Sequence, residues 1–213
     1  MPPARRQETE SPSFEDFARV LASGLEGVRA LTCEQITALF RHYTLFQRWN
    51  KVLNLSSISD FEAVVSRHYC ESIFLATQLP AAPSSIVDIG SGAGFPGVPI
   101  AVLHPSSRVC LVESRQRKAT FLKEATRRLP NVEVRCQRAE DPVGRFDWLV
   151  SRAVAWKDLE PIAADATSSV ALLSTASDAR EIMLCRRFLW WEPTPLPWGR
   201  QIVLLIGEVS RGT

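Results

Sequence analysis

The most constraining feature of this chain is a short apolar run that breaks into alternating glycines. Residues 86–89 read Ile-Val-Asp-Ile and suit a buried parallel strand, and residues 90–97 read Gly-Ser-Gly-Ala-Gly-Phe-Pro-Gly, with a helix expected to begin near Pro96. The glycines that lead the turn are Gly90, Gly92 and Gly94. Because they lack Cβ atoms, a ligand can approach the backbone closely at the carboxyl end of the strand. The pattern predicts a nucleotide-type cofactor loop.

The spacing of the turn separates three classes of cofactor. A phosphate-binding P-loop requires Lys followed by Ser or Thr after its last glycine, and the turn has neither. A dinucleotide fingerprint requires glycine at the sixth position, where Phe95 stands, so NAD is the second choice. The run Asp-x-Gly-x-Gly-x-Gly over residues 88–94 instead resembles motif I of the S-adenosylmethionine-dependent methyltransferases. The resemblance indicates S-adenosyl-L-methionine as the cofactor.

A second strand supports this type of ligand. Residues 108–113 are apolar and β-branched and end in Glu113, about 20 residues beyond the glycine turn. A Rossmann-like sheet places an acidic side chain there against ribose hydroxyls. Glu113 is therefore the candidate ribose acceptor. The alternative is a solvated glutamate at the end of a strand.

The chain as a whole predicts an α/β protein with the Rossmann-like class I methyltransferase fold, in which a doubly wound sheet with a C-terminal antiparallel hairpin follows an N-terminal helical segment. Strands are expected near 86–89, 108–113, 132–136, 146–151 and 170–174, and the hairpin near 187–192 and 201–209. Helices are expected over 13–24, 32–52 and 60–79. The junction at Pro80–Ser84 divides a helical segment packed on the core (1–80) from an S-adenosylmethionine-binding domain (81–213).

The cysteine and hydropathy patterns bear on location and metal binding. The five cysteines are odd in number, never spaced as Cys-x-x-Cys and mostly within apolar runs, which favours buried free thiols over disulfides or a metal site. No run approaches the roughly 18 apolar residues that a membrane span requires. We therefore expect a cytoplasmic monomer without a metal or a membrane partner.

Basic residues gather after the second expected strand, although the formal net charge is only +2. Nine Lys or Arg residues stand against three Glu between Arg108 and Arg138. Apolar residues keep helical spacing through this stretch, at Ala119, Leu122, Ala125 and Leu129. The basic side chains then form the outer face, and Lys118 and Lys123 are the candidate substrate-binding residues. A charge run is commonly only a solvated helix face, but its proximity to Glu113 favours polyanion binding.

Five short motifs together resemble the bacterial RsmG (GidB) family. They are Trp-Asn-Lys-Val-Leu-Asn-Leu-Ser at 49–56, Arg-His-Tyr-Cys-Glu-Ser at 67–72, the turn at 90–97, Arg-Ala-Glu at 138–140 and Ser-Arg-Ala-Val at 151–154. The family usually has aspartate where Glu71 and Glu113 stand. The resemblance implies methylation of N7 of one guanine in the decoding-region loop of 16S ribosomal RNA, either as RNA or as the small ribosomal subunit.

The resemblance and the turn together give a set of expected contact residues. Those for the cofactor are Gly90, Gly92, Gly94, Phe95, Glu113, Ser114, Arg115, Ala139, Glu140 and Arg152. Arg152 is also expected to contact the substrate, with Lys118 and Lys123. The alternatives are core packing for Phe95 and a solvated turn for Glu140.

The corner at residues 151–154 limits the chemistry. It is neither the Asn/Asp-Pro-Pro-Tyr/Phe corner of amine methylation nor a cysteine nucleophile for C5 methylation. The N7 lone pair of guanine is already nucleophilic and carries no proton, so no catalytic acid or base is expected, and His42, His68 and His104 are interpreted as structural. A small-molecule methyltransferase, a non-catalytic RNA-binding assembly factor and an NAD-dependent dehydrogenase stay open as alternatives.

Overall fold

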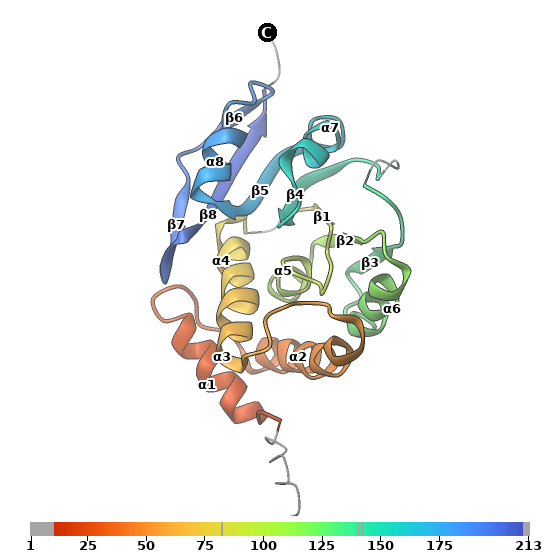
Figure 1. Ribbon diagram of the computed structural model, residues 1–213, viewed down its shortest axis with the longest axis vertical. Coiled ribbons are helices and arrows are strands. Elements are labelled where there is room, and N and C mark those ends of the chain that lie inside the picture. The colour runs from red at the N-terminus through yellow and green to blue at the C-terminus, as the bar shows by residue number, and fades with distance from the viewer. Residues whose placement is uncertain (1–10, 82, 140, 142, 211–213) are drawn as a thin grey trace, which may run out of the picture.

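The computed structural model describes residues 11–81, 83–139, 141 and 143–210 (Figure 1). The helices are α1 (Phe14–Gly24), α2 (Cys33–Leu53), α3 (Phe61–Val64), the π-helical turn η1 (Val65–Cys70), α4 (Glu71–Gln78), α5 (Gly97–Leu103), α6 (Gln116–Ala125), α7 (Trp156–Ala166) and α8 (Ala176–Ile182). The strands are β1 (Ser85–Ile89), β2 (Arg108–Val112), β3 (Val132–Arg135), β4 (Phe146–Arg152), β5 (Thr167–Thr175), β6 (Phe188–Trp190), β7 (Thr194–Leu196) and β8 (Gly199–Val209).

Helix α2 begins one residue after Thr32, the first residue of its expected range. Thr32 and Gln35 form a capping box at the start of α2, with the Thr32 N–H donating to Gln35 Oε1 at 3.0 Å and the Gln35 N–H to Thr32 Oγ1 at 3.3 Å. The helix expected over 60–79 is present as α3, η1 and α4 in direct succession. The π-helical turn was not anticipated from the sequence, because a wider hydrogen-bond repeat leaves no local signature.

The sheet confirms the expected fold class. Its order is β3-β2-β1-β4-β5-β8-β6, with β1 to β5 paired in parallel and β8 antiparallel to both β5 and β6. The expected C-terminal antiparallel pair is therefore β6 with β8. The short strand β7, which the sequence did not predict, also pairs with β8.

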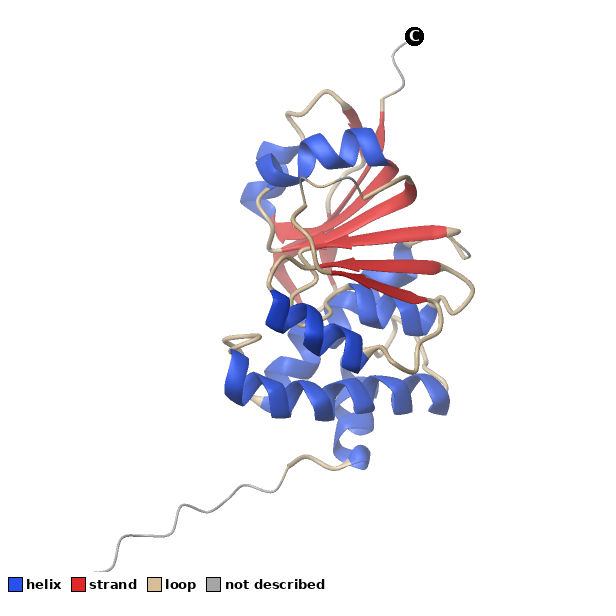
Figure 2. Cartoon of the chain, turned by 90° about the vertical axis from the view of Figure 1, so that its right-hand side faces the viewer, coloured by secondary structure: helices blue, strands red, loops and turns tan. Residues whose placement is uncertain are grey.

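Helices cover both faces of the sheet (Figure 2), and an apolar cluster lies on each face. Successive residues of β1 alternate between them: Ile86 belongs to the cluster with α5 and the N-terminal helices, and Val87 to the cluster with α7 and α8. The N-terminal helices thus share one continuous core with the sheet. The division of the chain between residues 80 and 81 stays a prediction.

The cysteines correct one expectation. All five are unpaired, but Cys33 and Cys136 are exposed, whereas Cys70 and Cys110 are buried. In the part of the chain that the structure describes, no helix has the length and apolar character to cross a membrane. The same residues contain no group of three or more His, Cys, Asp or Glu side chains placed to hold a metal ion.

Candidate functional site

The glycine-rich turn joins the end of β1 to α5 and is tied to β2. The N–H groups of Gly90 and Ser91 both donate to the Val112 carbonyl, at 2.9 and 3.1 Å. Gly90, Gly92 and Gly94 have φ angles of 75°, 55° and 90°. A residue with a Cβ atom is strained in this left-handed region. The backbone conformation therefore requires glycine at these positions, in addition to the access that glycine gives to a ligand.

Gly97 provides the close helix–strand contact that a dinucleotide fingerprint assigns to its sixth position. A Cβ atom at Gly97 would collide with Leu111 of β2 and would lie 2.6 Å from Asp88 Oδ2. The start of α5 therefore lies directly against the sheet. This role was not anticipated from the sequence, although a fourth glycine at the first residue of the helix was a signal for it.

Asp88 closes the turn. Its Oδ2 accepts from the Gly97 N–H at 3.0 Å, while Oδ1 is buried and has no hydrogen-bond partner among the described residues. Burial raises the pKa of the Asp88 carboxyl to about 7, against the opposing effect of the hydrogen bond from Gly97. Asp88 thus fixes the turn from its buried side.

Glu113, immediately after β2, holds two neighbouring backbone segments. Its Oε2 accepts from the Gly92 N–H at 3.0 Å and its Oε1 from the Arg115 N–H at 2.8 Å. The residue is only 6% exposed, so the alternative of a solvated glutamate is wrong. Each carboxylate oxygen can accept a second hydrogen bond, which leaves capacity for ribose hydroxyls.

Gly90 and Glu113 line a cavity of about 520 Å³ at the carboxyl ends of β1 and β2. Five of the expected cofactor-contact residues line it: Gly90, Glu113, Ser114, Arg115 and Ala139. The volume is that of a small-molecule site, and spare carboxylate acceptors beside a turn without Cβ atoms fit the hydroxyl-bearing cofactor S-adenosylmethionine. Gly92 and Gly94 shape the turn without lining the cavity. Glu140 lies outside the described residues.

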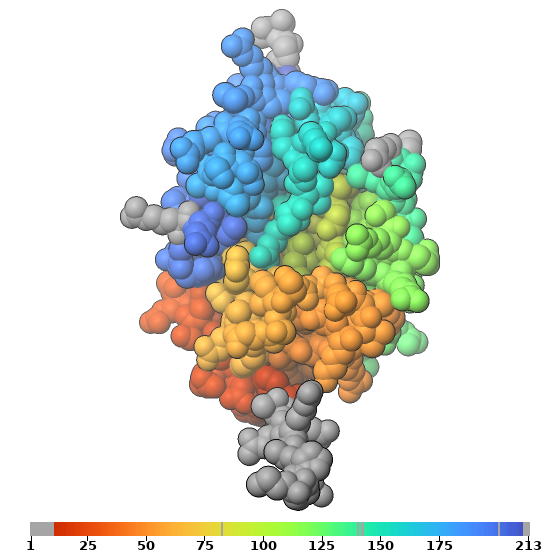
Figure 3. Space-filling model, in the orientation of Figure 1, coloured from red at the N-terminus to blue at the C-terminus, as the bar shows by residue number. Residues whose placement is uncertain are grey.

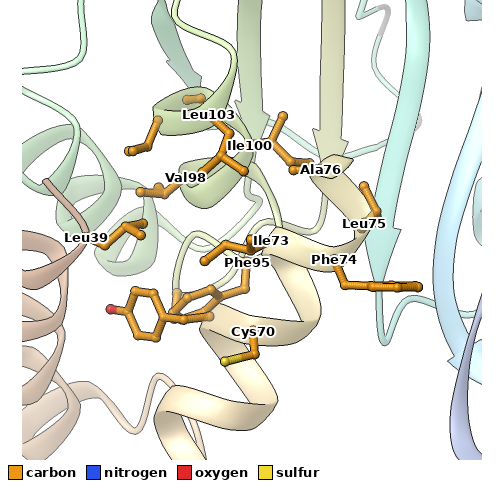
Figure 4. Packing of buried hydrophobic residues seen from close by; sticks show 14 of the residues in the cluster. Leu39, Cys70, Ile73, Phe74, Leu75, Ala76, Phe95, Val98, Ile100 and Leu103 are labelled. Atoms are coloured by element: carbon orange, nitrogen blue, oxygen red, sulfur yellow. The ribbon is translucent and has the colours of Figure 1, made fainter. Parts of the chain in front are cut away.

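The Phe95 ring points into the core rather than over this cavity (Figure 4). Its centroid lies 4.8 Å from that of the His68 ring, in a stack, and 5.0 Å from that of Tyr69, edge to face. Phe95 is not among the residues that line the cavity, so its expected contact with the cofactor stays a prediction. Core packing is what the geometry supports, because the helices before residue 80 enclose the ring.

Arg152, the last residue of β4, is held by the N-terminal helices. Its Nη1 donates to the Arg67 carbonyl and lies 3.1 Å from His68 Nδ1, and its Nη2 forms an ion pair with Glu71 Oε2 at 3.0 Å, without hydrogen-bond alignment. Burial raises the pKa of the Glu71 carboxyl, and Arg152 opposes that shift. Arg152 lines a second cavity, next to the first. The motifs at 67–72 and 151–154 thus meet in space, which their spacing along the chain did not reveal.

His68 links Arg152 to a further residue, Ser56. Because an arginine only donates, His68 Nδ1 accepts from Arg152, and the proton lies on Nε2, which donates to Ser56 Oγ at 2.8 Å. Burial, followed by the charges of Arg152 and Arg67, lowers the pKa of His68 to about 3. A neutral ring with both nitrogens engaged is structural, as expected.

The other two histidines are structural as well. His42 of α2 donates from Nε2 to the Ala93 carbonyl of the turn at 3.0 Å, and its Nδ1 accepts from the Tyr69 hydroxyl at 2.7 Å. Burial lowers the pKa of His42 to about 4. His104 Nε2 lies 2.9 Å from the Ala76 carbonyl. His42 therefore connects the helical segment directly to the glycine turn.

The basic side chains of helix α6 begin at the first cavity. Arg115, at its N-cap, lines the cavity, while Lys118 is half-buried and Lys123 is exposed. The opposite side of α6 is buried, at Ala119, Phe121 and Leu122. Figure 3 shows α6, in green, next to α2, in orange, on one face of the molecule.

The sheet order and the glycine turn define the fold class of this protein, which is the Rossmann-like class I methyltransferase fold. Solved structures with this fold include a putative O-methyltransferase from Klebsiella pneumoniae (TM-score 0.59, 13% identity, 92% of this chain and 99% of that one). Another is the 23S rRNA methyltransferase ErmE (TM-score 0.52, 16% identity, 66% of this chain and 68% of that one).

Sequence similarity assigns the chain to a family, which is a more specific identification than the fold class. The chain belongs to the GidB family, because the family model described as rRNA small subunit methyltransferase G matches residues 35–164. A protein named Ribosomal RNA small subunit methyltransferase G from Stenotrophomonas maltophilia strain K279a is 39% identical over 68% of this chain and 69% of its own. The protein of that name from Roseiflexus sp. strain RS-1 is 43% identical over 57% of this chain and 55% of its own, so the match spans about half of that relative.

Replacing Gly90 by alanine is expected to weaken S-adenosylmethionine binding by at least about tenfold, because the added methyl group meets Val154 on the cavity wall. Gly27→Ala is the matched control. Gly27 has a φ of 72°, close to the 75° of Gly90, but nothing lies within 4 Å of an added Cβ. Calorimetric titration with the cofactor measures both affinities, and circular dichroism checks folding. Equal affinity in the two folded variants would contradict the role given to this turn.

The stability contribution of Asp88 is expected to fall with rising pH. The folded chain keeps this carboxyl protonated up to about pH 7, whereas the unfolded chain releases the proton near the ordinary value of 3.8. The folded state therefore binds more protons between these limits, and its advantage is lost as the pH rises through them. Asp88→Asn does not titrate. Urea denaturation at several pH values should show the free energy of unfolding of wild type, relative to Asp88→Asn, decreasing across this window; a constant difference would contradict the burial effect.

Proposed function

We propose that this chain transfers a methyl group from S-adenosylmethionine to N7 of a guanine in the decoding-region loop of 16S ribosomal RNA. The observation that carries the proposal is the chemistry of the corner after β4. The Ser151 hydroxyl donates to the Ile89 carbonyl at 2.8 Å, the Arg152 guanidinium is only a donor, and the next two residues are Ala153 and Val154. No side chain of this corner takes a proton or attacks a base. N7 of guanine requires neither, because it has a lone pair and no proton.

Rate enhancement then arises from placement. When bound, S-adenosylmethionine supplies an electrophilic methyl group on a sulfonium sulfur. Glu113 and Gly90 hold the cofactor side of the site, and Val154 lines both this cavity and the adjoining cavity at the ends of β4 and β5. Holding two reacting groups in line contributes up to about 7–11 kcal/mol to lowering a barrier. We assign no catalytic acid, base or nucleophile.

The cofactor contacts follow the walls of the first cavity. Glu113 accepts from the ribose hydroxyls, and the segment after β3 at Ala139 places a backbone N–H beside the adenine edge. Ser114 and Arg115 complete the wall after β2. The contacts of Glu140 and Arg152 with the cofactor stay predictions that rest on the family resemblance.

A ribosomal RNA substrate also gives the basic surface of α6 a function. Lys118 and Lys123 follow the cavity-lining Arg115 along α6, where they would meet backbone phosphates around the methylated guanine. We further propose that the protein acts as a monomer in the cytoplasm, on 16S RNA or on the small ribosomal subunit.

The direct test is incubation with tritiated S-adenosylmethionine and either 16S RNA or small ribosomal subunits that lack the modification. Nucleoside analysis is expected to find the label in 7-methylguanosine at one position. Label in another nucleoside would correct the acceptor atom. Label only in small molecules would favour a small-molecule methyltransferase, and RNA binding without label would favour a non-catalytic assembly factor.

Replacing Arg115, Lys118 and Lys123 together by glutamine is expected to weaken RNA association and to flatten its salt dependence. Each lost phosphate contact lowers the logarithmic salt slope by roughly 0.7–0.9. A triple variant of Arg19, Arg29 and Arg186, exposed arginines of other segments, removes the same charge as a control. Filter binding at several salt concentrations measures the slope. Equal salt slopes in the two triple variants would show that the basic side chains of α6 form only a solvated helix face.

Arg152→Lys is expected to reduce methyl transfer at saturating cofactor on the order of tenfold, because a lysine keeps the charge but loses the planar fork that spans Arg67, His68 and Glu71. Arg145→Lys, at an exposed arginine before β4, is the control. Single-turnover kinetics measures the rate, and nucleoside analysis should find no second methylated position. Normal turnover in Arg152→Lys would contradict a positioning role for this arginine.

A further inference from the structure

A second cavity, of about 490 Å³, adjoins the cofactor cavity. It lies where the carboxyl ends of β4 and β5 meet the starts of α7 and α8. Val154 lines both cavities, so they meet at that side chain. The volume of the second cavity is also that of a small-molecule site. A group bound in it would lie next to the cofactor.

The backbone between the two cavities is strained. Ala153 has a φ of 59°, in the left-handed region that is costly for any residue with a Cβ atom. This conformation turns the chain directly after Arg152 and presents Val154 to both cavities. Strained residues of this kind collect at ligand sites, where the surrounding structure holds them in place.

The walls of the second cavity combine an apolar floor with two kinds of polar group. The floor is formed by Leu159, Leu172, Leu173, Ile182 and Ile202. Positive charge comes from Arg67 and Arg152, and a single carboxylate comes from Asp178 at the start of α8. Trp156 completes the wall, and its indole N–H is buried without a hydrogen-bond partner among the described residues. A flat, largely apolar molecule with hydrogen-bonding edges suits this environment.

Asp178 has no other assigned partner. Its backbone N–H donates at 3.1 Å to Thr175 Oγ1, the side chain that caps α8, and the residue is exposed, with no ion pair from its carboxylate among the described residues. It also lies beyond residues 35–164, the range that the family model matches. Nothing in the family match therefore gives this carboxylate a function.

We propose that the second cavity receives the flipped-out guanine and that Asp178 recognises its Watson–Crick edge, an inference that rests on the proposed function. That edge of guanine carries two adjacent donors, N1–H and the exocyclic amine, which match the two oxygens of a carboxylate. Adenine presents an acceptor at N1 and is disfavoured there. O6 accepts from the Arg67 side. N7 lies in the other ring, at the far end from the amine, so gripping the amine end leaves N7 directed toward Val154 and the cofactor.

The test compares guanine with inosine, which keeps N1–H and N7 but lacks the exocyclic amine. Small subunits are reconstituted with 16S RNA that carries one or the other base at the methylated position. The wild-type protein is expected to methylate guanine at least about tenfold more efficiently, in kcat/KM, than inosine. Asp178→Asn is expected to lower methylation of guanine to near the inosine level and to lose the discrimination.

Glu181→Gln is the matched control, since Glu181 is an exposed carboxylate of the same helix that does not line the cavity. It should discriminate as the wild type does, and both variants should bind S-adenosylmethionine with unchanged affinity. Equal methylation of guanine and inosine by the wild type, or full discrimination by Asp178→Asn, would overturn the base pocket alone. Absence of methylated RNA with either base would overturn the proposed function itself. The wild-type comparison holds even if Asp178→Asn fails to fold.

Discussion

The hydrogen bond from the Gly97 N–H to Asp88 Oδ2, at 3.0 Å, closes the turn on which the cofactor cavity depends. It links the end of β1 to the first residue of α5, so the intervening chain must curl back over glycines with positive φ angles. The cost is a buried carboxyl whose pKa is raised to about 7 and whose second oxygen has no partner among the described residues. Both the open backbone at Gly90 and the approach of Glu113 to Gly92 follow from this closure.

The N-terminal helices belong to the site although they stand outside the sheet. His42 of α2 binds the Ala93 carbonyl of the turn, and His68 of η1 contacts Arg152 at the end of β4. Burial keeps both histidines neutral near pH 7, with pKa values of about 4 and about 3. Each ring therefore offers one donor and one acceptor, and each joins two elements that are far apart in the sequence. The N-terminal helices thus hold both the glycine turn beside the first cavity and Arg152 beside the second.

The ion pair of Arg152 with Glu71 shows how the same helices orient the corner after β4. Both side chains are largely buried, so burial raises the pKa of the Glu71 carboxyl and lowers the pKa of Arg152. Such a pair contributes little net stability, but loss of one partner leaves a buried charge uncompensated. The gain is in geometry. The guanidinium is fixed beside Arg67 and His68, and its position beside the second cavity is thereby set.

The sequence by itself determined the local features of this protein. The strand at 86–89, the glycine turn and the capping box at Thr32 follow from residues within a few positions of one another, since periodicity, caps and positive φ angles are local constraints. Only the tertiary structure decided that the Phe95 ring enters the core, that Glu113 already binds two backbone N–H groups and that Arg152 meets Glu71. Except for the bond between Glu113 and Arg115, these contacts join residues more than 20 positions apart. Packing of whole elements, not local propensity, brings such residues together.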